Sequence, residues 1–172
     1  MFWPSDLPDR NPILGHRCYE HEVLGRISYD PSRPGLVSHL VAVIELEDAF
    51  AVNARARFES RHGITLDPPV YGFHMSIFRG SIDQCDSVER LWGHLDGEKS
   101  QVQLTNELFW KGRSVWANAY SPEYNLLRHT LAGLDTFDAE TWGHATIGTF
   151  PQGCEFPRFL DYRDLDLWGF RP

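Results

Sequence analysis

Hydrophobic residues in the first half of the chain recur in two different periods, which predict strands separated by a helix. Residues 39–46 (HLVAVIEL) form a β-branched run that is typical of a strand. From Asp48 to about Arg61 the apolar residues recur at helical spacing, and Gly63 follows as a stop. After a proline-containing turn, residues 70–78 are expected to form a second strand.

The second half of the chain repeats this succession. Ser121 and Pro122 mark the start of a helix, with serine as the N-cap and proline in the first turn. The expected elements are, in order, a helix over 88–95, strands over 101–110 and 114–120, a helix over 122–131, and strands over 145–150 and 165–170. The chain is therefore expected to combine strands and helices in one fold.

The N-terminal residues differ in composition from the rest. Residues 1–35 are rich in proline and glycine, so we expect an irregular arm that contains one short strand, Leu24–Tyr29. Residues 36–172 are expected to form a single domain, because a chain of 172 residues suits one hydrophobic core better than two unrelated ones.

Two parts of this domain have the same architecture. Each is a strand, a helix and a second strand, over residues 39–78 and 114–150, and each second strand carries a histidine followed two positions later by a hydroxyl residue. The two triplets are His74-Met75-Ser76 and His144-Ala145-Thr146. Matching triplets in matching units indicate an internal duplication of architecture.

The two triplets have the side chains that phosphodiester cleavage needs. Residues two apart in a strand point to the same face, so His74 shares a face with Ser76, and His144 with Thr146. Histidine can take up or release a proton near neutral pH. Two imidazoles on opposite sides of one phosphate could activate the attacking oxygen and protonate the leaving oxygen. The hydroxyls could donate hydrogen bonds to the nonbridging oxygens. This scheme requires no metal ion.

The stretches FHMSIFRG and GHATIGTF resemble the paired HxT/S motifs of the 2H phosphoesterase superfamily. That superfamily includes RNA 2′,3′-cyclic phosphodiesterases, 2′–5′ RNA ligases and phage enzymes that degrade cyclic oligonucleotide signals. The resemblance covers roughly residues 37–170 and includes the stretch 109–120. It implies an α+β fold of two pseudo-symmetric lobes, each a small antiparallel sheet with flanking helices, around a central cleft. It also implies His74, Ser76, His144 and Thr146 as the catalytic residues, with no cofactor.

The activity implied by this resemblance is metal-independent hydrolysis of a 2′,3′-cyclic phosphate on a nucleotide or short RNA. Two other reactions of the same site remain open, namely hydrolysis of cyclic oligonucleotide messengers and 2′–5′ RNA ligation. A non-catalytic nucleotide-binding module and a structural domain with coincidental motifs are alternatives of a different class. Both motifs are intact in this sequence, which argues against loss of turnover.

The chain also departs from the family pattern. Ser76 stands where threonine is commoner, which keeps the hydroxyl, and Gly148 and Thr149 stand where the RNA phosphodiesterases often have an arginine. Arg79 could supply positive charge from the other motif instead. The N-terminal stretch GRISYDPSRPGL resembles uncharacterised bacterial or phage members of the superfamily more than it resembles the RNA branch.

Five further residues have side chains suited to binding a nucleotide. Arg79 could contact a phosphate, and Arg113 could steer one into the cleft. Three aromatic residues could stack on a nucleobase. Each side chain also has a structural interpretation: an ion pair for Arg79, packing for the aromatic rings and solvation for Arg113. The aromatic candidates are Tyr71, Trp110 and Trp116.

Net charge limits the class of ligand. The chain carries a formal charge of −8 and has a pI of about 5.4, whereas proteins that hold long nucleic acids usually have a basic surface. We therefore expect a small nucleotide or short RNA as the partner, and no long duplex. Residues 16–22 contain histidine, cysteine and glutamate, but they match no closed zinc pattern, so no metal site is expected.

The location of the protein is indicated by three further features. No apolar run approaches the roughly 20 residues of a membrane span, and the N-terminus lacks the pattern of a secretory signal. The three cysteines are widely spaced and form no CxxC pair, which disfavours a disulfide framework. These features predict a cytoplasmic protein with no membrane contact.

Overall fold

The computed structural model describes residues 19–30, 39–80, 82–111, 113–131 and 143–154. The helices and strands in these ranges alternate along the chain, with short 3-10 turns at Ile82–Gln84 and Gly93–Leu95. In chain order they are β1 (Tyr19–Tyr29), β2 (His39–Leu46), α1 (Ala49–His62), β3 (His74–Gly80), α2 (Cys85–Trp92), β4 (Lys99–Lys111), β5 (Ser114–Tyr120), α3 (Pro122–Leu131) and β6 (His144–Thr149).

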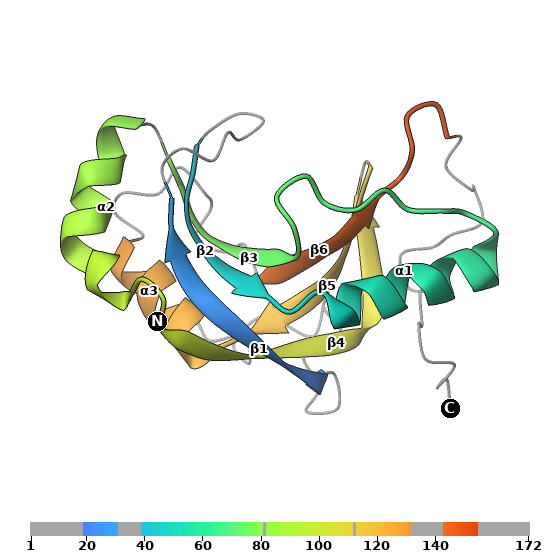
Figure 1. The fold of residues 1–172 in the computed structure, drawn as a ribbon, viewed down its shortest axis with the longest axis horizontal. Helices are drawn as coiled ribbons and strands as arrows, with labels where there is room; N and C mark the ends of the chain where they lie inside the picture. The colour runs from blue at the N-terminus through green and yellow to red at the C-terminus, as the bar shows by residue number, and fades with distance from the viewer. Residues whose placement is uncertain (1–18, 31–38, 81, 112, 132–142, 155–172) are drawn as a thin grey trace, which may run out of the picture.

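The strands form one closed antiparallel barrel, which Figure 1 shows with α1, α2 and α3 around it. The order around the barrel is β1-β2-β3-β6-β5-β4, and β1 pairs with β4 to close it. The mixed helix and strand composition agrees with the predicted fold class. The small sheets expected from the sequence are joined into one, because the long strands β1 and β4 pair with each other as well as with β2 and β5. Such closure satisfies backbone groups that would otherwise lie at open sheet edges.

Most predicted elements agree with the structure to within a few residues. β2, β5 and α3 have the predicted bounds, and α1 is displaced by one residue from Asp48–Arg61. The predicted caps are also present. Gly63 ends α1 with a φ of 66°, and Tyr124 N–H donates to Ser121 Oγ at 2.8 Å at the start of α3. The predicted strand over residues 165–170 lies outside the described residues.

Strand β1 is longer than the predicted Leu24–Tyr29. It begins at Tyr19 because it has a partner on each side: β4 pairs with it from Tyr19 onward and β2 from Gly25 onward. Part of the expected irregular arm therefore belongs to the barrel. This pairing is non-local, so the composition of the arm could not reveal it.

Strand β3 begins at His74 rather than at the predicted Val70. Val70 is 88% exposed, and the chain turns at Gly72, whose φ of 75° lies in the left-handed region. That conformation is incompatible with a continuing strand. His74 is consequently the first residue of its strand and lies directly after a tight turn.

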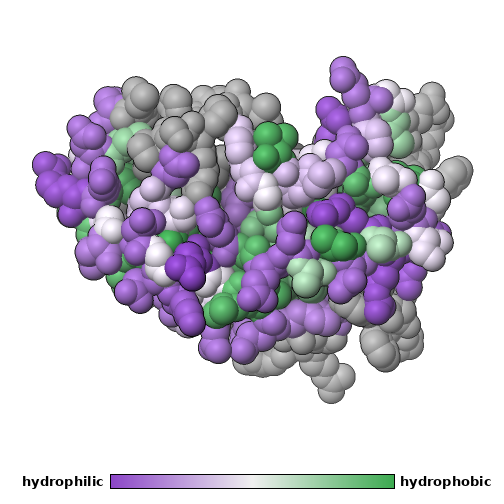
Figure 2. All heavy atoms as spheres, in the orientation of Figure 1, coloured by the Kyte–Doolittle hydropathy of each residue, from purple (hydrophilic) through white to green (hydrophobic). Residues whose placement is uncertain are grey.

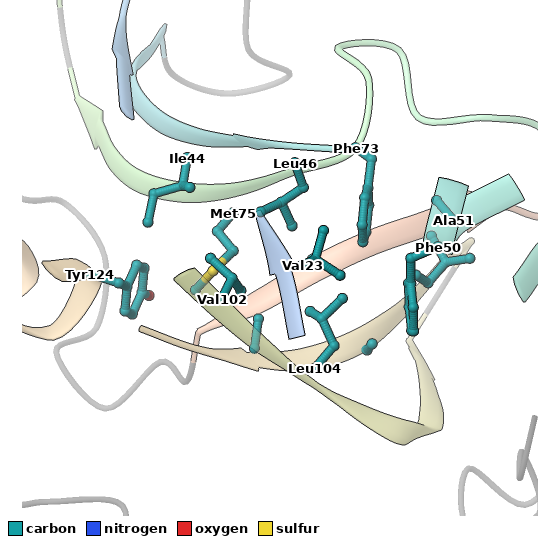
Figure 3. Close-up of a cluster of buried hydrophobic side chains, with 14 of the residues drawn as sticks. Val23, Ile44, Leu46, Phe50, Ala51, Phe73, Met75, Val102, Leu104 and Tyr124 are labelled. Carbon is teal, nitrogen blue, oxygen red and sulfur yellow. The ribbon is translucent and has the colours of Figure 1, made fainter. Parts of the chain in front are cut away.

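The hydrophobic core fills the inside of the barrel (Figure 3). Met75 of β3 lies in the middle of this cluster, and the ring of Phe73 stacks on that of Phe50 at 5.9 Å between centroids. Helix α1, which follows β2, and helix α3, which follows β5, both contribute residues to the core. Its members drawn in Figure 3 include Ile44 and Leu46 of β2, Val102 and Leu104 of β4, Phe50 and Ala51 of α1, and Tyr124 of α3.

Hydrophilic residues cover most of the molecular face shown in Figure 2. In the ranges that the structure describes, no helix combines the length and apolar character needed to cross a membrane. The exposed large hydrophobic residues lie on separate parts of the chain: Leu24, Val52, Val70, Leu91 and Leu126.

Two of the three cysteines lie in described residues, and no disulfide joins them. Cys85 is buried and Cys154 is half-buried, while Cys18 lies outside the described residues. Burial, reinforced by the neighbouring carboxylate of Asp86, raises the pKa of the Cys85 thiol. Because the thiolate is the reactive form, this shift lowers the reactivity of Cys85.

Candidate active site

The two histidine motifs lie on neighbouring strands. Met75 of β3 and Ala145 of β6 are directly opposite each other in an antiparallel pair, and both are fully buried on the core side. The same register places His74 opposite Thr146 and Ser76 opposite His144. All four predicted catalytic side chains therefore lie on one face of β3 and β6, on the side of the sheet away from the core.

The register also sets how far apart the four side chains are. Directly opposite residues have Cβ atoms about 4.5–5.5 Å apart, and diagonal neighbours about 7–8 Å. His74 and His144 are diagonal neighbours, and so are Ser76 and Thr146. His74 is 8% exposed, and the other three are half-buried. The arrangement matches a small group held between two imidazoles, with one hydroxyl beside each ring.

A backbone carbonyl orients the ring of His74. Nδ1 of His74 lies 2.9 Å from the carbonyl oxygen of Gly72. A carbonyl oxygen only accepts hydrogen bonds, so Nδ1 carries a hydrogen and Nε2 carries the lone pair in the neutral ring. The ring of Tyr71 meets the same imidazole edge to face, with centroids 6.4 Å apart. The turn before β3 thus determines both the tautomer and the direction of His74.

The turn itself supplies a testable prediction, since alanine at position 72 is strained at a φ of 75°. We expect Gly72→Ala to lower the free energy of unfolding by about 1–2 kcal/mol. In the phosphodiester cleavage that the two motifs predict, it should also lower kcat by up to about 10²-fold, because the carbonyl that orients His74 moves. Gly153→Ala is the matched control, because Gly153 has a similar φ of 81° in a turn beyond β6. Equal kcat in the two variants would contradict the orienting role of the turn.

Arg79 brings positive charge to the first motif. Its Nη2 donates a hydrogen bond of 3.1 Å to Ser76 Oγ. Because the Ser76 oxygen accepts this bond, the hydroxyl hydrogen can be donated to another acceptor. A register shift between Leu40 and Val43 of the neighbouring strand β2 lies beside this part of β3. The structure therefore places Arg79 together with the four motif residues.

The second motif has neighbours on β5. Trp116 is directly opposite Thr146, and Asn118 is directly opposite His144. The indole ring of Trp116 lies 5.9 Å from the His144 ring between centroids. Its Nε1 donates a hydrogen bond of 3.2 Å to Asn118 Oδ1. Trp116, one of the predicted nucleotide-binding residues, therefore lies beside the motifs.

Sequence reasoning missed Asn118 and the Gly72 carbonyl. The alternation along β5 offered a signal for Asn118, since residues two apart share a face and Asn118 follows Trp116 at that spacing. The Gly72 carbonyl offered no such signal, because the position of a backbone carbonyl depends on the turn conformation.

Arg113 is not brought to the motifs. Its Nε and Nη2 both donate to the carbonyl oxygen of Phe150, at 2.9 and 2.7 Å. This contact lies at the end of β5 far from Asn118, where Ser114 pairs with Thr149. Arg113 therefore anchors the chain after β6. The backbone of Trp110 belongs to β4, and its side chain lies outside the described part of the structure.

The structure leaves no space for a side chain at Gly148, two residues after Thr146. A Cβ atom at Gly148 would lie 2.8 Å from the Asp67 carbonyl oxygen and 3.0 Å from Leu66 Cβ. Asp67 is paired with Thr149 through two backbone hydrogen bonds of 2.8 Å, so this segment is held against β6. A cation at position 148 is therefore excluded, whereas Arg79 places one beside Ser76.

Comparison of the chain with protein-family models, with curated proteins and with solved structures gives no match. The resemblance to the 2H phosphoesterases consequently rests on the two motifs and their spacing. Family membership and the catalytic roles of the motif residues stay predictions, and their arrangement in space is what the structure adds.

Proposed function

We propose that this chain is a 2H-type phosphodiesterase that hydrolyses the 2′,3′-cyclic phosphate of a nucleotide or short RNA without a metal ion. The observation that carries the proposal is the pairing of Met75 with Ala145, which sets His74 and His144 diagonally on one face of two neighbouring strands. Diagonal neighbours on a sheet are about 7–8 Å apart, a separation on the scale of one phosphate group. Coincidental motifs in a structural domain would have no reason to meet in this way.

In the proposed reaction one imidazole removes a proton from water, and the resulting hydroxide attacks phosphorus. The bond from phosphorus to one ribose oxygen breaks, and the other imidazole donates a proton to that oxygen. Ser76 and Thr146 donate hydrogen bonds to the nonbridging oxygens as their negative charge increases. Arg79, which donates to Ser76 Oγ, adds positive charge beside the same oxygens. The single product carries a free ribose hydroxyl beside a phosphomonoester.

The two-lobed arrangement of the superfamily is part of this proposal. In it, β1-β2-α1-β3 and β4-β5-α3-β6 are the two equivalent lobes, and the motif strands β3 and β6 meet between them. Two observations support the assignment. Reading outward from the β3–β6 pair, the barrel order is β2 then β1 on one side and β5 then β4 on the other. Each motif strand is also preceded by a strand and a helix.

A small substrate fits both the charge of the protein and the surroundings of the motifs. The net charge of −8 disfavours a long polyanion. Tyr71 and Trp116 each place an aromatic ring beside one histidine, at 6.4 and 5.9 Å between centroids. Such rings can stack on a nucleobase attached to the phosphate. The proposed ligand is therefore one nucleotide or the end of a short RNA.

A turnover panel in excess EDTA tests the proposed function. The wild-type protein is incubated with 2′,3′-cyclic mononucleotides, a short RNA ending in a 2′,3′-cyclic phosphate, and a cyclic dinucleotide. We expect at least one of the 2′,3′-cyclic phosphates to be opened to a phosphomonoester at a rate that EDTA does not change. Opening of the cyclic dinucleotide alone would favour the messenger-degrading alternative. Activity that appears only with added divalent metal would overturn the mechanism.

A pair of substitutions at Ser76 tests the role of the hydroxyl. We expect Ser76→Ala to lower kcat by about 10²-fold, because one donor to the phosphoryl oxygens is lost. Ser76→Thr keeps the hydroxyl and introduces a residue favoured in strands, so its kcat should stay within about three-fold of wild type. The measurement is the steady-state rate on the best substrate of the panel. An equal loss in both variants would assign Ser76 a packing role instead.

A further inference from the structure

Asn118 has a buried polar side chain next to the motifs. It is 8% exposed, and it lies on β5 directly opposite His144. The flanking residues Ala117 and Ala119 belong to the core, so Asn118 points to the motif face of the sheet. A buried carboxamide needs hydrogen-bond partners for both its oxygen and its nitrogen.

The orientation of this carboxamide is determined by its neighbours. The backbone N–H of Asn118 donates to the hydroxyl of the fully buried Thr105 at 3.0 Å. The side-chain oxygen accepts the indole N–H of Trp116 at 3.2 Å. Because the indole nitrogen can only donate, the atom that faces it must be Oδ1 and not Nδ2. The amide nitrogen, with its two N–H donors, is therefore directed away from Trp116.

The two N–H donors of the Asn118 carboxamide take part in neither of these contacts. Within the part of the chain that the structure describes, the side chain of Asn118 makes its hydrogen bond through the oxygen, to the indole of Trp116. Because Oδ1 faces the indole of Trp116, Nδ2 lies on the other side of the carboxamide, on the face of β5 that carries the motifs. An oriented pair of N–H donors beside a histidine is suited to an anionic oxygen.

We propose that Asn118 is a further substrate-contacting residue, whose Nδ2 donates a hydrogen bond to a nonbridging oxygen of the bound phosphate. Trp116 acts as its positioning residue, because the indole N–H prevents the carboxamide from turning its oxygen toward the anion. The inference deepens the proposed function and rests on it for the identity of the substrate. It adds a donor on β5 to the hydroxyls of Ser76 and Thr146 on β3 and β6.

Direct binding tests the contact without a variant. Protein labelled with ¹⁵N is titrated with inorganic phosphate, and the side-chain NH₂ signals of Asn118 are followed after assignment through the backbone. We expect these signals to shift in a saturable way, whereas those of Asn53, an exposed residue on α1, stay in place. Unchanged Asn118 signals at saturating phosphate would overturn the inference.

Kinetics then tests the contribution to turnover. We expect Asn118→Ala to lower kcat on a 2′,3′-cyclic nucleotide by about 10–100-fold, as loss of an oxyanion donor does. Trp116→Phe keeps an aromatic ring and removes the indole N–H, so a loss of about 2–10-fold is expected. In the Asn118→Ala background Trp116→Phe should add no further loss of kcat. A full further loss would show that Trp116 acts independently of Asn118 and would overturn the positioning role. Asn53→Ala is the control that should match wild type.

The outcomes separate this inference from the proposed function. If wild-type protein opens no cyclic phosphate, the proposed function fails, and the phosphate titration alone decides whether Asn118 binds an anion. If wild-type protein is active and the kcat of Asn118→Ala is within two-fold of it, the proposed function stands and the substrate contact is overturned. Thermal unfolding of each variant shows whether a loss of turnover follows a loss of fold.

Discussion

Alanine in place of His74 or His144 is expected to remove nearly all turnover of the cyclic phosphate. Each imidazole is assigned one of the two proton transfers, and a positioned acid or base contributes roughly 10²–10⁴-fold. We therefore expect kcat to fall by about that factor in either variant. In the double variant, kcat should fall by less than the product of the two single losses. The effects of removing residues that act as one unit are not additive.

A matched control is available for these substitutions. His94 is exposed in the 3-10 turn Gly93–Leu95, with its ring stacked on Trp92 at 6.1 Å between centroids. His94→Ala removes an imidazole outside the two motifs, and its kcat should equal that of wild type. Rates are compared in excess EDTA on the best substrate of the panel, after circular dichroism has shown that each variant is folded. Retention of wild-type kcat in either motif variant would exclude that histidine from the chemistry.

Met75→Ala is expected to produce the largest loss of stability. Met75 is fully buried in the core, and it is the residue of β3 that pairs with Ala145 of β6. Truncating a buried methionine to alanine removes apolar contacts and leaves a cavity, which lowers the free energy of unfolding by about 2–5 kcal/mol. That is a large part of the roughly 5–15 kcal/mol that stabilises a typical domain. The variant should therefore unfold at a lower denaturant concentration than the wild-type protein.

Chemical denaturation measures this effect against two controls. Met75→Leu conserves volume and should cost less than about 1.5 kcal/mol. Val70 is 88% exposed, so Val70→Ala should change the free energy of unfolding by no more than about 0.5 kcal/mol. If Met75→Ala had as little effect as Val70→Ala, the pairing of β3 with β6 over a packed core would be wrong. The catalytic geometry derived from that pairing would then be lost as well.

The local pattern of residues predicted most of the elements correctly. β2 and β5 could be located because β-branched and alternating residues form a pattern within a few positions of the chain. The start of α3 and the end of α1 could be located because Ser121 and Gly63 cap the helix next to them. Where the predicted bounds of a strand were wrong, tertiary contacts or a turn set the actual first residue. β1 extends back to Tyr19 because β4 pairs with it. β3 begins only at His74, after the turn at Gly72.

For the candidate site, sequence and structure contributed different parts. Alternation in a strand was enough to place a histidine and a hydroxyl on one face of each motif strand. The sequence could not show that Arg113 would be bound to the Phe150 carbonyl while Arg79 reaches Ser76. Nor could it orient the Asn118 carboxamide, since that depends on a hydrogen bond from Trp116.

The amino-acid sequence by itself determined which side chains are available for chemistry and which of them share a strand face, because a period of two is a property of the extended backbone. Only the tertiary structure decided that β3 and β6 are neighbours and that Met75 meets Ala145. Strand order and register follow from burying apolar faces that come from distant parts of the chain, and a one-residue slip would turn both motifs into the core. The distance between the two histidines is therefore a consequence of packing that no local pattern encodes.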